Sequence, residues 1–205
     1  MNNIVITIGR EYGSGGKYIG EQVAKKLKIN CYDKEIINKT YEKNNCNYSK
    51  LEEYDEVKKS SIRKALDLLS ITSDEMIYDN DMYQLLINKT IEEIVDSESC
   101  VIIGRNSNKV LKNRPNAINI FIYSNDLEFK IKRKMEIENL SYDEAFKKLK
   151  KVDKNRKQYY EYLNKNCIWG NRREYDFCLD SSVLGVEKTA DLIVDIYNKL
   201  SKKDT

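Results

Sequence analysis

The stretch ITIGREYGSGGKYIG, residues 6–20, contains five of the eight glycines of the 205-residue chain: Gly9, Gly13, Gly15, Gly16 and Gly20. Glycine destabilises helices and strands, so such a cluster marks backbone that must turn sharply or approach a ligand closely. The apolar run at residues 3–8 predicts a buried strand before the glycines, and helical spacing in 17–28 predicts a helix after them. Strand, glycine-rich turn and helix together predict a phosphate-binding loop, because backbone N–H groups and the helix N-terminus attract anions.

Lys17 directly follows the last loop glycine and could reach the β- and γ-phosphates of a nucleotide. The general pattern is G-x-x-x-x-G-K-[ST], and Gly16-Lys17 fits its Gly-Lys step. Glu11 stands where the first glycine belongs, and Tyr18 stands where a Mg²⁺-binding hydroxyl belongs. We therefore predict Ser14 as the hydroxyl ligand of Mg²⁺. The predicted cofactor-binding residues are Gly13, Ser14, Gly15, Gly16, Lys17 and Tyr18.

Two other interpretations of this loop stay open on the pattern alone. One is a tight turn between strand and helix, with a solvated lysine. The other is dinucleotide binding, since Gly13-x-Gly15 begins G-x-G-x-x-G and Asp33 lies roughly where a ribose-binding carboxylate would stand. The third glycine position of that pattern holds Tyr18, whose bulk would obstruct close packing of helix on strand. The pattern therefore favours a nucleoside triphosphate over a dinucleotide as the ligand of this loop.

The composition excludes several classes of function. The chain contains no histidine, which removes Ser-His-Asp and Cys-His catalysis, and its five cysteines include no C-x-x-C pair, which argues against a zinc site. The formal net charge of +3 is too mild to predict binding to nucleic acid. We expect a cytoplasmic protein with no membrane partner, because the sequence has no apolar run of spanning length and no secretory signal pattern.

Short apolar strands alternate with amphipathic helices along the chain. Further strands are predicted at 29–32, 100–103, 117–123 and 176–179. Helices are predicted at 82–97, at 125–139, from 141 to beyond 156, and at 186–200. This alternation predicts an α/β fold with a parallel sheet covered by helices on both faces. We expect one domain over residues 1–205, with an acceptor-binding helical insertion at 44–81 and a basic lid at 130–173.

Five motifs follow one another along the chain: ITIGREYGSGGKYIG, INCYDKEII, VIIGRN, KKVDKNRKQYY and EYDFCLDSS. In this order they resemble the cytidylate kinase-like family of P-loop nucleoside monophosphate kinases. The resemblance implies a P-loop NTPase-type fold with a helical lid. It also implies transfer of the γ-phosphoryl group of ATP, with Mg²⁺, to a nucleoside monophosphate, CMP or dCMP first. The chain departs from the classical members at Tyr18 and at Asn106, which replaces an aspartate.

Phosphoryl transfer needs positive charge around the moving group more than covalent help from the protein. Lys17 is the first candidate for this role, and resemblance to the family's lid adds three more, so the predicted catalytic residues are Lys17, Arg133, Lys151 and Arg156. The predicted substrate-binding residues are Arg10, Asp33, Arg105 and Asp153. Arg105 follows a central strand and suits a bidentate contact with the acceptor's phosphate. The role of Asp153 is implied by the resemblance alone.

Each of these residues also has a structural interpretation. Arg10 could pair with Glu11, Asp33 could cap a helix, and Arg105 could form a salt bridge. The lid residues could be a solvated helix face, and Tyr159, Tyr160 and Trp169 could pack in the core or stack on a base. The rival functions are a nucleotide-binding regulatory module without phosphotransfer and a P-loop kinase for another small molecule. A nucleic-acid binder is a distant third.

Overall fold

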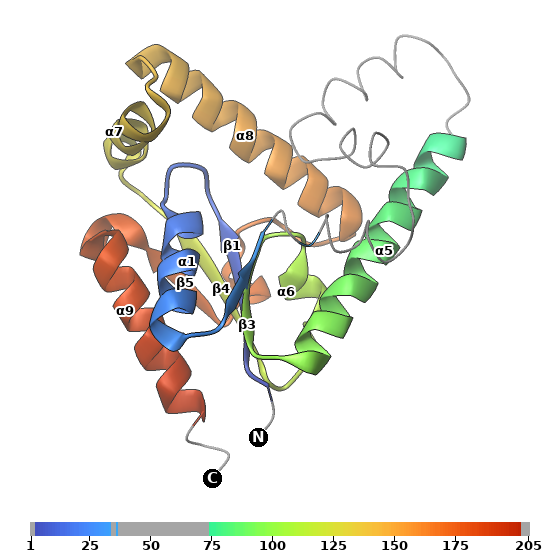
Figure 1. The fold of residues 1–205 in the computed structure, drawn as a ribbon. Coiled ribbons are helices and arrows are strands. Elements are labelled where there is room, and N and C mark those ends of the chain that lie inside the picture. Colours follow the sequence, from blue (N-terminus) through green and yellow to red (C-terminus); the bar gives the residue numbers. More distant parts are fainter. Residues whose placement is uncertain (1–2, 34–35, 37–73, 202–205) are drawn as a thin grey trace.

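Five short strands form one parallel sheet in the computed structural model, which describes residues 3–33, 36 and 74–201 (Figure 1). The strands are β1 (Val5–Arg10), β2 (Asn30–Tyr32), β3 (Cys100–Ile103), β4 (Ala117–Tyr123) and β5 (Phe177–Asp180). Their order across the sheet is β2-β3-β1-β4-β5, and every pairing is parallel. The β-branched runs predicted at 100–103 and 117–123 coincide with β3 and β4.

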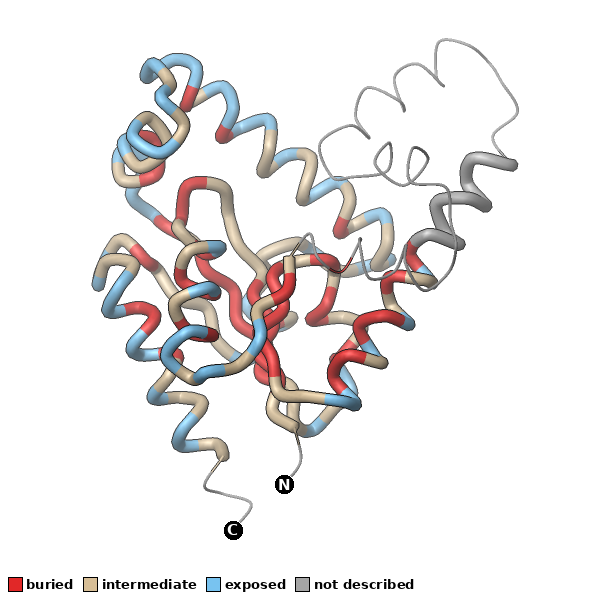
Figure 2. The backbone as a smooth tube through the Cα atoms, in the orientation of Figure 1, coloured by how far each residue is buried: buried red, intermediate tan, exposed pale blue. Residues whose placement is uncertain are grey.

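Helices connect these strands and cover both faces of the sheet (Figure 1). They are α1 (Gly16–Leu27), α5 (Asp74–Ser97), α6 (Ser107–Val110), α7 (Leu127–Glu138), α8 (Tyr142–Leu163), the 3-10 helix η1 (Arg172–Glu174) and α9 (Ser181–Ser201). Since successive strand residues point to opposite faces, Ile6 and Ile8 join one buried cluster with α1 and α9, while Val5 joins another with α5. Figure 2 shows that many of the residues in the sheet between these layers are buried. The predicted α/β fold with helices on both faces is confirmed.

The sheet topology places a crevice next to β1. Ile19 of α1, the helix after β1, packs in one cluster, whereas Val110 of α6, the helix after β3, packs against the other. The chain therefore turns in opposite directions after two neighbouring parallel strands. In open α/β sheets ligands bind at such a switch point, outside the carboxyl ends of the strands.

The helices α7 and α8 form a hairpin above this edge of the sheet, called here the α7–α8 hairpin (Figure 1). Asp126 caps α7 by accepting from the Phe129 amide. Ser141 and Glu144 form the predicted capping box of α8. The hairpin has a small hydrophobic cluster of its own, made by Ile131, Ala145 and Leu149. It lies within the predicted lid region 130–173, except for the first residues of α7.

The structure extends some predicted elements and adds others. The helix predicted at 82–97 begins at Asp74, and the final helix begins at Ser181 with a non-helical residue, Gly185, inside it. The short helices α6 and η1 were not predicted. In the predicted insertion 44–81, residues 74–81 belong to α5 and residues 44–73 lie outside the described residues. Within the described part of the chain, every helix is too short or too polar to cross a membrane.

Candidate functional site

The glycine-rich loop, residues 11–15, joins β1 to α1 and needs its glycines for steric reasons. Gly13 and Gly15 have φ angles of +83° and +80°, in the left-handed region that disfavours other residues. A Cβ atom on Gly13 would lie 2.8 Å from the Cβ of Lys130, and one on Gly15 would lie 2.6 Å from Val186. Helices α7 and α9 therefore press directly on the loop backbone.

Ser14 fastens this loop to the neighbouring strand. Its hydroxyl oxygen lies 2.9 Å from the carbonyl oxygen of Glu11 and 3.1 Å from that of Ile122, and the residue has no exposed surface. The Ser14 carbonyl in turn accepts from the Ser181 hydroxyl at 2.6 Å. These contacts give Ser14 a structural role in the loop. They do not turn its hydroxyl toward solvent, so the Mg²⁺ contact stays a prediction without support from the geometry.

Three predicted cations converge on one carboxylate at the ends of β1, β2 and β3. Asp33 lies 3.3 Å from the Lys17 ammonium, 3.8 Å from the Arg10 guanidinium and 4.0 Å from the Arg105 guanidinium. Arg105 and Asp33 are largely buried, while Lys17 is 58% exposed. The Lys17 ammonium also lies 3.8 Å from Glu21 of the same helix. These ion pairs gather three cationic side chains at the crevice. Such a group attracts a multiply charged anion.

The backbone after β3 is shaped to bring two of these arginines together. Gly104, Arg105 and Asn106 all have positive φ angles, of 73°, 57° and 57°. A Cβ atom on Gly104 would lie 1.8 Å from the Arg10 side chain, so the Arg10 guanidinium rests directly against this backbone. The left-handed turn therefore leaves room for Arg10 and holds Arg105 beside it.

A pocket that is partly open to solvent continues from this cation cluster. Its charged wall consists of Arg10, Arg105 and Arg156, and its aromatic wall consists of Tyr159, Tyr160, Trp169 and Tyr175. Behind the aromatic wall, Phe121 packs edge-on against Trp169, with ring centroids 5.4 Å apart. Burial raises the pKa of Tyr160 and of Tyr175, so both hydroxyls stay neutral hydrogen-bonding groups. The pocket thus combines anion-binding groups with flat apolar surface.

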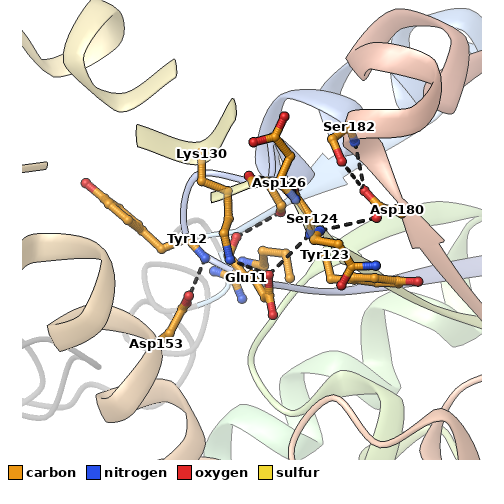
Figure 3. A network of polar contacts seen from close by, with 12 residues as sticks. Glu11, Tyr12, Tyr123, Ser124, Asp126, Lys130, Asp153, Asp180 and Ser182 are labelled. Atoms are coloured by element: carbon orange, nitrogen blue, oxygen red, sulfur yellow. Dashed lines mark hydrogen bonds and ion pairs between the residues drawn. The ribbon is translucent and has the colours of Figure 1, made fainter. Parts of the chain in front are cut away.

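Helix α8 reaches the glycine-rich loop through two of the predicted residues. The Tyr12 amide donates to Asp153 at 2.7 Å (Figure 3). The Arg156 guanidinium donates at 3.2 Å to the carbonyl of Arg10, which directly precedes the loop. Burial raises the pKa of Asp153 to about 6, although the Tyr12 amide and the Arg156 charge act in the opposite direction. The α7–α8 hairpin is therefore in direct contact with both the loop and the pocket.

The sequence matches the model of the cytidylate kinase-like family over residues 5–183. The chain belongs to this family. A search of curated proteins gave no significant match. Among solved structures, this cytidylate kinase-like chain is similar to an uncharacterized protein from Eubacterium ventriosum, with 28% identity and a TM-score of 0.71 over 96% of this chain and 99% of that one.

Two more distant structures share the fold of this family member. The gluconokinase from Sinorhizobium meliloti has 12% identity and a TM-score of 0.54, covering 98% of this chain and 95% of that one. The shikimate kinase from Acinetobacter baumannii has 14% identity and a TM-score of 0.50, with the same coverage of both chains. The P-loop fold is therefore established. Family membership supports a kinase acting on a nucleotide or another small molecule.

The structure brings together most of the predicted site residues of this cytidylate kinase-like chain. Arg133 lies over the loop, because its guanidinium is 5.5 Å from the centre of the Tyr18 ring and close to Gly15. Tyr18 itself donates to Glu187 of α9, and its predicted contact with the nucleotide stays a prediction. Lys151 is exposed on α8, and among the described residues no ion pair joins it to the cation cluster.

Several residues that matter here were not predicted. Lys130 and Glu11 form a 2.9 Å ion pair beneath the loop (Figure 3), and Glu11 also accepts from the Ser124 amide. Asn106, which replaces the usual aspartate of the family, accepts a 2.7 Å hydrogen bond from Asn164 at the end of α8. Tyr12 belongs to the glycine-rich stretch 6–20. An aromatic side chain among glycines was the only sequence feature that could have marked it as important.

Proposed function

We propose that this cytidylate kinase-like protein transfers the γ-phosphoryl group of ATP to a nucleoside monophosphate, with CMP or dCMP as the first candidates. One observation carries the proposal: a cluster of Arg10, Lys17 and Arg105 around Asp33 connects the glycine-rich loop with the pocket. Arg10 precedes the loop and Lys17 follows it, while Arg10 and Arg105 also line the pocket. A donor held by the loop and an acceptor held in the pocket would therefore meet at this cluster of cationic side chains.

The donor side suits a nucleoside triphosphate. The loop ends at the N-terminus of α1, where amides and the helix dipole bind phosphate, and the half-exposed Lys17 is the second residue of that helix. Val183 and Leu184 are exposed apolar residues just after Ser181, whose hydroxyl holds the loop. They offer a surface for a nucleobase beside the phosphate site. Mg²⁺ would bind mainly through phosphate oxygens and water, as it usually does in such sites.

The acceptor side suits a small molecule with one anionic end and one flat face. Arg10, Arg105 and Arg156 can bind a phosphate, and arginine is well shaped for two parallel hydrogen bonds to it. Trp169 and the tyrosines of the pocket present flat surface at the other end. These features support a nucleoside monophosphate, whose phosphate already provides an ionised oxygen as nucleophile.

The chain's own residues would act by position and charge. Lys17 would neutralise oxygens of the transferred group, and Arg133 would approach the donor phosphates from α7. Asp33 holds Arg10 and Arg105 in the crevice. An acceptor phosphate entering there would compete with Asp33 for the same guanidinium groups. The arginines can therefore be paired with Asp33 before the substrate binds and with the phosphate afterwards.

The test is a panel of acceptors with Mg-ATP, scored by ADP formation. The panel contains the ribo- and deoxyribonucleoside monophosphates, and shikimate and gluconate represent other small molecules. Turnover of CMP or dCMP above all others supports the proposal. Turnover of shikimate or gluconate alone would contradict a nucleotide acceptor and favour a kinase for another small molecule. ATP binding without turnover of any acceptor would favour the regulatory module.

A further inference from the structure

Tyr12 belongs to the glycine-rich loop, but its polar contacts are made with the α7–α8 hairpin. Its amide donates to Asp153 of α8 at 2.7 Å, and its hydroxyl donates to Glu138 of α7 at 2.5 Å. The Lys134 ammonium lies 4.2 Å from the centre of its ring, and the Arg156 guanidinium lies 5.9 Å from it. Both helices of the hairpin are thus bound to one loop residue.

The Tyr12 ring also completes the apolar interior of the hairpin. It packs against the cluster of Ile131, Ala145 and Leu149, which otherwise consists only of residues from 131–149. A hairpin with so small a core gains much of its fixed position from whatever it packs against. Here the loop supplies an aromatic side chain for that purpose.

The charges around the Tyr12 hydroxyl favour a lasting contact. Glu138 also accepts from Lys134 at 2.8 Å and from Lys148 at 2.6 Å. Burial would raise the pKa of Glu138, but the hydrogen bonds from Lys134, Lys148 and Tyr12 outweigh it and lower that pKa to about 2. Burial, together with Glu138, raises the pKa of Tyr12 above its usual value. A neutral phenol therefore donates to an ionised carboxylate throughout the physiological pH range.

The position of Arg156 depends on the same contacts. This arginine lies near the Tyr12 ring, donates to the Arg10 carbonyl and lines the pocket. Asp153, one turn earlier on α8, is 3.7 Å from it. Movement of the hairpin away from Tyr12 would withdraw Arg156 from the pocket wall.

We infer that Tyr12 is a positioning residue that fixes the α7–α8 hairpin on the glycine-rich loop and thereby holds Arg156 in the acceptor pocket. The effect on the acceptor rests on the function proposed above. The attachment of the hairpin does not, and it can be measured without any substrate.

The first experiment measures amide hydrogen exchange in the nucleotide-free protein. Tyr12→Phe removes the hydroxyl donor and keeps the ring. Its control is Tyr142→Phe, because the Tyr142 hydroxyl donates to Glu128 within the hairpin and does not touch the loop. Tyr12→Phe should speed exchange in α7 and α8 by about 10-fold, the effect of losing one hydrogen bond to a charged group. Equal exchange in the two variants would overturn the inference.

The second experiment separates a positioning role from a general loss of stability. Tyr12→Ala should raise the acceptor KM by about 10-fold, the effect of losing one charged contact, and Tyr12→Phe should restore part of it. The KM for ATP should change much less. Faster exchange in the hairpin with an unchanged acceptor KM would overturn the link to Arg156. If no acceptor is turned over at all, the proposed function fails, while the exchange data still decide whether Tyr12 holds the hairpin.

Discussion

Replacing Asp153 by asparagine should remove a pH dependence from the free energy of unfolding. The Asp153 side chain is only 18% exposed, and burial raises its pKa from 3.8 to about 6. Between these two values the native state holds a proton that the unfolded chain has already released. Raising the pH through this window therefore destabilises the wild-type protein, because the native state must ionise a buried group.

The size of this effect follows from the two pKa values. Each tenfold change in proton affinity corresponds to about 1.4 kcal/mol, so the wild-type protein loses ~3 kcal/mol once the pH exceeds the native pKa. Asparagine cannot ionise, yet its amide oxygen can still accept from the Tyr12 amide. The stability of Asp153→Asn relative to wild type should therefore increase by ~3 kcal/mol between about pH 4 and pH 7.5. Any constant cost, such as weaker pairing with Arg156, cancels in this change.

Urea unfolding followed by far-UV circular dichroism measures this difference at each pH. The control is Asp143→Asn, which removes an exposed carboxylate from the first turn of the same helix. The control should not acquire the ~3 kcal/mol increase. If Asp153→Asn and wild type keep a constant stability difference across the range, the carboxyl of Asp153 is not buried against the loop as described.

Three further substitutions test the site. Lys17→Ala should lower kcat by about 10²–10³-fold, the effect of losing one preorganised charge. Its control is Lys25→Ala, which removes an exposed lysine from the same helix and should leave kcat unchanged. Normal turnover by the Lys17 variant would show that Lys17 has no role in the reaction. Arg105→Ala should raise the acceptor KM by about 10-fold or more and change the KM for ATP far less, and equal losses for both substrates would contradict its place in the pocket. Gly13→Ala should lower the free energy of unfolding in urea by ~2 kcal/mol, because φ is +83° and the new Cβ would lie 2.8 Å from Lys130; an unchanged midpoint would show that α7 does not press on the loop.

The fold was predictable because its signals are local. The runs at 100–103 and 117–123 are β-branched and apolar, so they predicted β3 and β4 without error. The last strand spans Phe177–Asp180, one residue later at each end than predicted. The acid-rich stretch 74–81 has no apolar period, so the first turns of α5 gave no signal in the sequence.

The site was predictable where strand ends supply the residues. Arg10, Asp33 and Arg105 follow three parallel strands, and the carboxyl ends of such strands meet at one edge. Lys151 was grouped with Asp153 and Arg156 by resemblance, but residues three apart share a helix face and residues two apart do not. Lys151 is two residues before Asp153 and five before Arg156, and neither spacing places it on the helix face that these two residues share.

The contacts of Tyr12 could not be predicted in the same way. Its partners Glu138 and Asp153 are more than a hundred residues away in the chain, and no periodic pattern connects them. A tyrosine in a glycine-rich loop was noticeable in the sequence, but its contacts depend on where the α7–α8 hairpin lies in the fold.

The aromatic wall of the pocket contains Trp169, the only tryptophan of the chain. Its indole ring lies edge-on to Phe121, and its amide donates to Glu161 of α8. Intrinsic fluorescence excited at the indole band therefore reports from a single known point in the lining of the pocket. A molecule that occupies the pocket should change that emission whether or not it is phosphorylated, so affinities for candidate acceptors can be titrated without a label and ranked independently of turnover.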